Sequence, residues 1–585
     1  MLPIFAFGQE LSSNLNTDDD HEHHDHEHHD HNHSQDSIAP QVNDTLYVDF
    51  EEVYQGIDFS KSINFWKITE RTGEIIKGSP DTLITDYFNR TNMEGYGVSV
   101  AYLGNLGSPI ESRIFSERKD RSQFMFFDPY WAYAKKPDNF HFINTKTPYS
   151  NISYQRAGSR TNMEERLQGM LAVNMNKKLN IGLDIDYLYA RGFYNSQGTK
   201  HLDWSLFGNY ISDRHQVHAF LNAANYVNAE NGGITDDLLI THPEINNRPT
   251  QTKDISTNIY DTWNRISGNQ VYLNYRYNLG FYRDTDIEDE EGNMIKRFHP
   301  VASLSYTGHY DDKKRKYYTN NTSQLNSYYN NELFLPESFN PDTTSYWTLK
   351  NTIALSMREG FSKWAKFNLT AYINHETRSF NSLEREIIYP QIPTSNISEW
   401  SLTSIDTIAP LRKTNQNSTY IGGELSKKNG KILRYDAQGS FGVLGYNLGD
   451  INISGHVETR IPIFKDTASI DLIASIKNIA PTFYENHYHS KYFWWDKDFN
   501  KVQKLRLGGL ITIPHTKTKL GINVENVSNY IYFDDKGLPQ QNSGSIQVLE
   551  ARLEQNFHYK ILHWDNQLVY QTSSNQDVIP LPDFA

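Results

Sequence analysis

The residues best suited to chemistry in this sequence are histidines close to its N-terminus. Eight of them lie within positions 18–36, interleaved with aspartate and glutamate: His21, His23, His24, His26, His28, His29, His31 and His33. Neutral imidazoles beside carboxylates bind Zn²⁺, Ni²⁺ or Cu²⁺ readily. Two interpretations stay open: a tail that captures metal ions, or a soluble tether with incidental metal affinity, because a low-complexity segment implies no fixed ligand geometry.

A second group of candidates consists of charged residues at alternate positions of strand-like segments. They are Asp184, Asp186, Glu458, Arg460, Asp471, Glu550, Arg552 and Glu554. Side chains two positions apart share one face of a strand, so these charges are predicted to line a pore, where rings of charge can set ion selectivity. The alternative is a wall of salt-bridged charges that only stiffens the structure.

The sequence contains none of the common catalytic signatures. No Gly-Xaa-Ser-Xaa-Gly, phosphate loop, dinucleotide fingerprint or His-Glu-Xaa-Xaa-His occurs. The chain has 0 cysteines, which removes thiolate catalysis and Cys-based zinc sites. We therefore expect no enzyme and no cofactor, apart from Zn, Ni or Cu bound adventitiously by the histidine-rich tail. A net charge of -14 makes nucleic acid an unfavourable partner.

Long alternating segments must position these residues. In 179–189, Leu179, Ile181, Leu183, Ile185, Tyr187 and Tyr189 share one face, and polar residues share the other. The same period recurs at 451–461, 468–477, 518–526 and 549–557, and period two is the signature of a β-strand. Such runs reach about 10 to 13 residues, the length needed to cross a membrane. The fold class predicted is all-β: a large antiparallel transmembrane β-barrel of roughly 16–20 strands.

The connections between these segments tend to alternate in length. Tight turns such as 176–178, 212–213 and 514–516 alternate with long polar links such as 227–267 and 312–344, as in barrels of the outer membrane. Two connections break the pattern, because 282–298 is long and 444–448 is short. The aromatic run Tyr492–Trp495 fits an interfacial girdle at a strand end.

The sequence divides into four predicted parts. Residues 1–9 read as the remnant of a signal peptide, and 10–45 as a disordered acidic and histidine-rich tail. Residues 46–90 form a periplasmic or plug-like segment, and 91–585 form the barrel. Pro580 and Pro582 are incompatible with an ordinary ladder strand, so C-terminal strands are expected to be missing.

Three stretches carry a resemblance to a known family. Residues 81–118, 127–158 and 180–210 resemble the putative porin family of Bacteroidota outer membranes. The resemblance implies a Gram-negative outer-membrane barrel and a porin-like channel for passive diffusion of small solutes or ions. Its partners would be outer-membrane lipid, those solutes and the outer-membrane assembly machinery, and the oligomeric state stays open. The alternatives are a substrate-specific or energised transporter and a surface-exposed all-β binding protein.

Overall fold

The computed structural model describes residues 62–78, 97–242, 244, 251–288, 294–329, 341–362, 365–388, 405–463 and 466–585. All of them belong to one compact unit that spans 47–585. The predicted signal-peptide remnant, the tail and its eight histidines lie outside the described residues. Among the residues described, no helix is long and apolar enough to cross a membrane.

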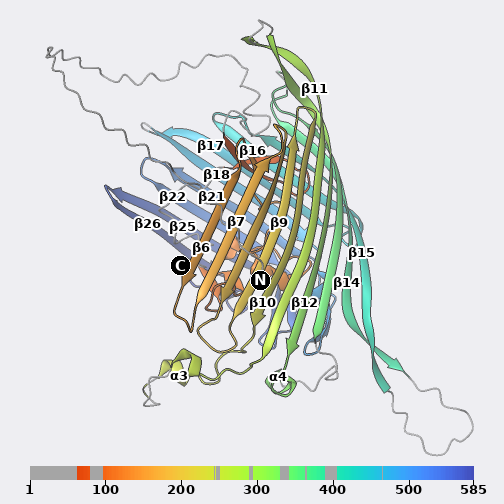
Figure 1. The fold of residues 1–585 in the computed structure, drawn as a ribbon, viewed down its shortest axis with the longest axis vertical. Coiled ribbons are helices and arrows are strands. Elements are labelled where there is room, and N and C mark those ends of the chain that lie inside the picture. The colour runs from red at the N-terminus through yellow and green to blue at the C-terminus, as the bar shows by residue number, and fades with distance from the viewer. Residues whose placement is uncertain are drawn as a thin grey trace, which may run out of the picture. The chain divides into compact units, whose positions relative to one another are not determined.

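Seventeen strands form a closed barrel, within the predicted range of 16–20 (Figure 1). In the order of the chain they are β6 (Tyr149–Ala157), β7 (Glu164–Asn174), β8 (Leu179–Ala190), β9 (Thr199–Ile211), β10 (His215–Ala229), β11 (Thr262–Glu288), β12 (Met294–Thr319), β13 (Asp342–Met357), β14 (Asn368–Ile388), β15 (Ile405–Lys427), β16 (Leu433–Gly445), β17 (Ile451–Ile463), β18 (Asp466–Ile479), β21 (Val502–Ile513), β22 (Thr518–Ser528), β25 (Ser545–Tyr559) and β26 (Leu562–Ser573).

The barrel has one junction that differs from the others. From β6 round to β26, every neighbouring pair of strands is antiparallel. The ring closes between β26 and β6. Because the number of strands is odd, these two strands run in the same direction, and the described residues show no continuous ladder between them, unlike the antiparallel ladders at the other junctions. Beyond Pro582, residues 583–585 also pair with β26, where the backbone N–H of Val569 donates to the carbonyl of Ala585 at 2.9 Å.

The wall is apolar outside and polar inside, the reverse of a water-soluble protein. In β9 the side chains of Leu202, Trp204 and Leu206 are 41%, 39% and 44% exposed, whereas His201 and Asp203, which alternate with them, are buried. A closed sheet pairs every backbone polar group within itself, so this apolar outer surface can face hydrocarbon. The predicted transmembrane β-barrel is therefore confirmed.

Connection length separates the two ends of the barrel more cleanly than the sequence indicated. One end carries 175–178, 212–214, 289–293, 358–367, 428–432, 464–465, 514–517 and 560–561. The other end carries 230–261, 320–341, 389–404, 480–501 and 529–544, with three shorter links at 158–163, 191–198 and 446–450. The expected exception at 282–298 was wrong, because most of it extends β11 and β12. Short turns mark the periplasmic end of such barrels, so the long connections face outward.

The described residues before β6, 62–78 and 97–148, form a plug within the barrel, and the first barrel strand begins at Tyr149 rather than at the predicted residue 91. The described part of the plug contains a three-stranded sheet of β2 (Ile75–Gly78), β1 (Ile63–Ile68) and β5 (Phe142–Thr145), and a hairpin of β3 (Val100–Tyr102) and β4 (Ile110–Ser112). Two 3-10 helices follow the hairpin, η2 (Phe115–Glu117) and η3 (Met125–Tyr130). These strands have three to six residues, too short to span a membrane.

The remaining elements belong to the long connections. They are α3 (Leu238–Thr241), η5 (Thr252–Asp254), α4 (Thr322–Tyr329), α5 (Phe483–Asn486), β19 (His487–His489), β20 (Trp494–Asp496), β23 (Ile531–Phe533) and β24 (Pro539–Gln541). Figure 1 shows α3 and α4 at one end of the barrel and the tip of β11 at the other. The predicted girdle at Tyr492–Trp495 was wrong, because Tyr492 and Trp495 are buried in aromatic clusters instead.

Candidate functional site

Two aromatic clusters dock the plug against the wall. In one, Phe127 of the plug stacks on Tyr226 of β10 at 5.6 Å, and Phe124 stacks on Tyr346 of β13 at 6.2 Å. In the other, Trp66 of β1 donates its indole N–H to His218 of β10 at 3.0 Å. Stacked and edge-on aromatic pairs bury large apolar areas, so these two clusters hold the plug against strands β10 and β13.

Two half-buried carboxylates, Glu70 and Glu74, fix the plug to strands β11, β12 and β13. Glu70 contacts Lys350 at 2.6 Å and His309 at 2.7 Å. Burial alone would raise the pKa of Glu70, but Lys350 and His309 outweigh it and hold that pKa well below its ordinary value. Glu74 contacts Arg276 at 3.0 Å and Arg358, which follows β13, at 2.8 Å. Both carboxylates are therefore ionised, and both are compensated by cations of the wall.

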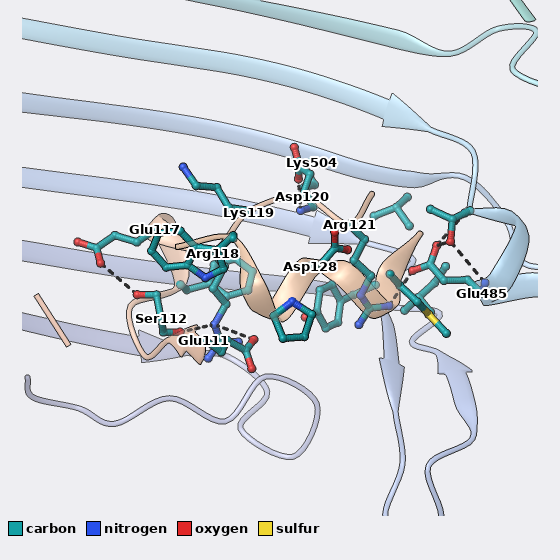
Figure 2. A pocket seen from close by; sticks show the side chains of 18 of the residues that line it. Glu111, Ser112, Glu117, Arg118, Lys119, Asp120, Arg121, Asp128, Glu485 and Lys504 are labelled. Atoms are coloured by element: carbon teal, nitrogen blue, oxygen red, sulfur yellow. Dashed lines mark hydrogen bonds and ion pairs between the residues drawn. The ribbon is translucent and has the colours of Figure 1, made fainter. Parts of the chain in front are cut away.

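A cavity of about 720 Å³ remains between the plug and the wall of β18, β21 and β22. It lies toward the end of the barrel with the long connections, since residues 480–482 and 530–531 also line it. Figure 2 shows plug segment 111–128 crossing in front of these strands, with Asp120 beside Lys504 and Arg121 directed toward Glu485. Tyr102, Phe115, Trp131, Tyr530 and Phe533 add aromatic surface. The cavity has the size of sites that hold small molecules.

The charges of this cavity are balanced in sign and mostly paired. Its acidic residues are Glu111, Glu117, Asp120, Asp128, Glu485 and Glu525, and its basic residues are Arg118, Lys119, Arg121, Lys477, Lys504 and Arg506. Asp120 bridges Lys477 at 2.5 Å and Lys504 at 2.8 Å. Burial would raise the pKa of Asp120, but the two ammonium groups, Lys504 first, hold it below its ordinary value. Asp120 thus keeps its negative charge between the two lysines, and Figure 2 shows it beside Lys504.

A second cavity of about 330 Å³ lies on the other side of Arg121. It is lined by ion pairs of plug and wall, among them Glu70 with Lys350 and Glu376 with Arg378. Arg121, Gln123 and Ile479 line both cavities. The Arg121 guanidinium contacts Glu485 at 2.7 Å and lies 5.2 Å from the ring centre of Phe533. Arg121 therefore stands at the boundary between the two spaces and is held there from the outer connections.

The structure places the predicted pore-lining residues on the inner face of the wall, where nearly all have charged partners. Two reach the plug: Asp184 contacts Lys135, and Arg552 contacts Glu117 at 2.6 Å. The others pair with the wall: Asp186 with Arg166, Glu458 with Arg460, Asp471 with His456, Glu554 with Lys519, and Glu550 with Arg552. None of the eight lines either cavity. The contacts of these eight residues match the alternative of a wall of salt-bridged charges, and their role in ion conduction stays a prediction.

The residues that do line the larger cavity were not singled out from the sequence. Lys477 and Lys504 lie on strands with clear alternation, but Asp120, Arg121 and Asp128 lie in a plug segment without periodicity. The available signal was the density of charge between Glu117 and Arg121, ahead of the aromatic run Phe124–Phe127. Nothing in that pattern shows that the segment folds back into the lumen.

Comparison with known proteins gives this architecture a family. No curated protein matches the sequence. The chain is similar to the siderophore receptor PirA from Acinetobacter baumannii, with 11% identity and a TM-score of 0.46 over 74% of this chain and 63% of that chain. A ferric enterobactin receptor from Pseudomonas aeruginosa has 10% sequence identity and a TM-score of 0.46, over 73% of this chain and 63% of that chain. The copper transporter OprC has 10% identity and a TM-score of 0.49, over 82% of this chain and 75% of that chain. The chain thus spans less than two thirds of the first two receptors.

The sequence itself matches the family described as Putative porin across residues 62–585, which covers the plug as well as the barrel. An origin in Bacteroidota stays a prediction. Porins of this type are proteins of the Gram-negative outer membrane, and the apolar exterior of their closed barrel faces the hydrocarbon of that membrane. By its sequence match and its seventeen-strand barrel, this chain belongs to the putative porin family of the outer membrane.

Proposed function

We propose that this protein is a channel of the outer membrane that passes small polar solutes between the plug and the barrel wall. The observation that carries the proposal is that Arg121, Gln123 and Ile479 line both cavities. A route of this kind needs neither a catalytic residue nor a cofactor. It differs from an open pore because the plug occupies the lumen and leaves only the space beside it.

The lining of the larger cavity indicates the class of solute. Acidic and basic side chains are equal in number there, and five aromatic rings share the space with them. A cavity with one dominant sign of charge would concentrate ions of the opposite sign, whereas a balanced one favours neither. A neutral polar or zwitterionic molecule with an apolar part therefore fits the lining better than a simple ion.

The Arg121–Glu485 pair is the proposed restriction of the route. The buried Glu485 carboxylate accepts a hydrogen bond from the Arg121 guanidinium at 2.7 Å. Glu485 also forms a capping box with Thr482 at the start of α5. Arg121 is thereby fixed from both sides, by the plug backbone and by the outer connection. Removing the guanidinium would widen the junction without touching any barrel strand.

Conductance in planar bilayers tests this route. Arg121→Gln should raise the single-channel conductance and the uptake of small zwitterions into proteoliposomes, relative to the unaltered chain. The matched control is Arg156→Gln on β6, where the arginine pairs with Glu165 outside both cavities. Equal conductance of Arg121→Gln and Arg156→Gln would show that the route does not pass Arg121.

A second candidate function is transport that requires displacement of the plug. It is favoured by the buried ion pairs at Glu70 and Glu74, which anchor the plug to β11, β12 and β13. In this case the unaltered chain should hold a tight seal in bilayers, and Arg121→Gln should leave the seal intact. Only Glu70→Gln or Glu74→Gln, which loosen the plug, should then produce openings.

A further inference from the structure

A small hairpin in the connection between β18 and β21 brings two histidines and an aspartate to one face. Strands β19 and β20 pair His487 with Asp496, Tyr488 with Trp495, and His489 with Trp494. Alternate residues of a strand share a face, so His487 and His489 lie together, and Asp496 joins them from the opposite strand. The donor atoms of these three side chains all lie within 4.8 Å of one another.

The opposite face of the hairpin is built into the protein core. Tyr488 and Trp495 are buried and pack on each other with ring centres 4.9 Å apart. The Trp495 indole N–H donates to the carbonyl of Tyr484 at 3.1 Å, and Arg315 of β12 donates to the Tyr488 hydroxyl at 3.1 Å. These contacts hold the hairpin against β12 and α5, and they do not involve its histidine face.

The histidine rings are oriented by their neighbours. Trp494 stacks on His489 with ring centres 3.8 Å apart and planes within 10°. His487 Nδ1 contacts one carboxylate oxygen of Asp496, and His489 Nε2 lies 3.0 Å from the other.

We propose that His487, His489 and Asp496 form a binding site for a divalent transition-metal ion such as Zn²⁺. Two imidazoles and one carboxylate are a common ligand set for zinc and its neighbours in the periodic table. In a tetrahedral site with ligand distances of about 2.1 Å, donor atoms are about 3.4 Å apart. The three donors lie within 4.8 Å of one another, so side-chain rotations that even out their spacing would admit the ion.

The arrangement also leaves room for exchange. Asp496 is 60% exposed at the end of the hairpin, whereas His489 is nearly buried. One side of the site is therefore open to water, which would supply the remaining ligand, and an ion could enter from the outer surface. The competing interpretation is that the carboxylate only clamps the two imidazoles by hydrogen bonds, and it predicts no metal affinity.

The experiment uses the full chain, purified in detergent, with the eight tail histidines replaced by serine so that the tail does not compete. Zn²⁺ bound after equilibrium dialysis is measured against a chelator of known affinity, and Co²⁺ absorption reports the coordination number. A stacked pair on β25 and β26, His558 and His563, could also take metal, so the chain additionally carries His563→Gln.

One bound zinc per chain is expected in this background. Asp496→Asn should weaken it at least tenfold, and His487→Gln with Asp496→Asn should abolish it. His515→Gln, which removes an exposed histidine in the β21–β22 turn, should leave it unchanged. Since Asp496 is exposed, its variant should keep the mobility of the folded barrel. No zinc binding by the folded background chain, or full binding after the double substitution, would overturn the proposal.

Discussion

At the scale of single residues, most charged side chains described in the interior of this barrel contact an oppositely charged partner. Asp120 shows the principle most clearly, because one carboxylate of the plug neutralises two lysines of the wall. Hydrogen-bonded opposite charges within about 3 Å offset each other's desolvation. Removing one partner should therefore expose the other to the solute route.

Asp120→Asn should make the channel more selective for anions. Lys477 and Lys504 would lose their shared counter-charge, and two uncompensated ammonium groups would then face the larger cavity. The measurement is the reversal potential in a gradient of potassium chloride. Glu111→Gln, which removes a carboxylate that is 70% exposed at the cavity edge, should shift it much less. Equal shifts would mean that Asp120 lies off the route.

The same residue predicts how selectivity depends on pH. The pKa of Asp120 is held below its ordinary value of 3.8, so the carboxylate stays ionised as the pH falls from 7 to about 4. Its contribution is lost only when the pH falls through the lowered pKa. The difference in reversal potential between the unaltered chain and Asp120→Asn should hence be constant from pH 7 to pH 4. A difference that vanished near pH 5 would contradict this.

Glu74→Gln should loosen the plug. The substitution leaves Arg276 and Arg358 without their carboxylate in a buried place, which costs about 3–5 kcal/mol when an ion pair is broken on one side. Hydrogen exchange of backbone amides in 62–78 should accelerate while that of the barrel strands stays slow. Glu165→Gln on β7, which removes the carboxylate paired with the exposed Arg156 of β6, is the control. Unchanged exchange in β1 and β2 would place the anchoring elsewhere.

At the scale of elements, the sequence predicts the strands of the barrel wall far better than it predicts the plug inside the barrel. Strands such as β8 and β9 alternate over 12 and 13 residues because one face meets lipid and the other a polar interior. That contrast is strong enough to be read without any tertiary information. The apparent exception at 282–298 arose because the polar tips of β11 and β12 extend beyond the apolar band, where alternation fades.

The sequence indicated a periplasmic or plug-like segment at 46–90, but the extent and fold of the plug were not predicted, for a physical reason. Its strands are three to six residues long, and its side chains meet a polar wall rather than lipid, so no periodic pattern marks them. Trp66 and Phe142 are buried by contacts with residues more than sixty positions away, such as His218. The hairpin His487–Asp496 was misjudged likewise: its aromatics resembled a membrane girdle, whereas the connection folds inward onto Phe126 and Tyr484.

The seam between β26 and β6 should be the weakest junction of the barrel. The two strands run in the same direction and share no continuous ladder among the described residues, whereas their other neighbours pair in antiparallel ladders. Amides of β6 and β26 that point toward the seam should exchange at least tenfold faster than those of β9 and β10. Hydrogen exchange in lipid nanodiscs measures this directly. Uniform protection around the ring would show that the seam is as strong as any other junction.

At the scale of the whole molecule, the inverted distribution of polarity decides where the protein is stable. Outward-facing Leu, Ile and Val would be a liability in water, where they would expose apolar surface along every strand. In hydrocarbon the same surface needs no cover, and the closed sheet leaves few backbone groups unpaired. The inner charges can then be numerous, since the plug and the wall neutralise one another.

Leu206→Arg tests this inversion against a matched site. Leu206 is 44% exposed near the middle of β9, and Leu238 is 50% exposed on α3 in an outer connection. If the β9 face meets hydrocarbon, Leu206→Arg should lower the free energy of unfolding in lipid vesicles by about 2–4 kcal/mol. Leu238→Arg, equally exposed but in water, should change it by less than about 0.5 kcal/mol. Unfolding followed by tryptophan fluorescence in urea measures both, and equal effects would mean that the outer face of β9 does not lie in the membrane.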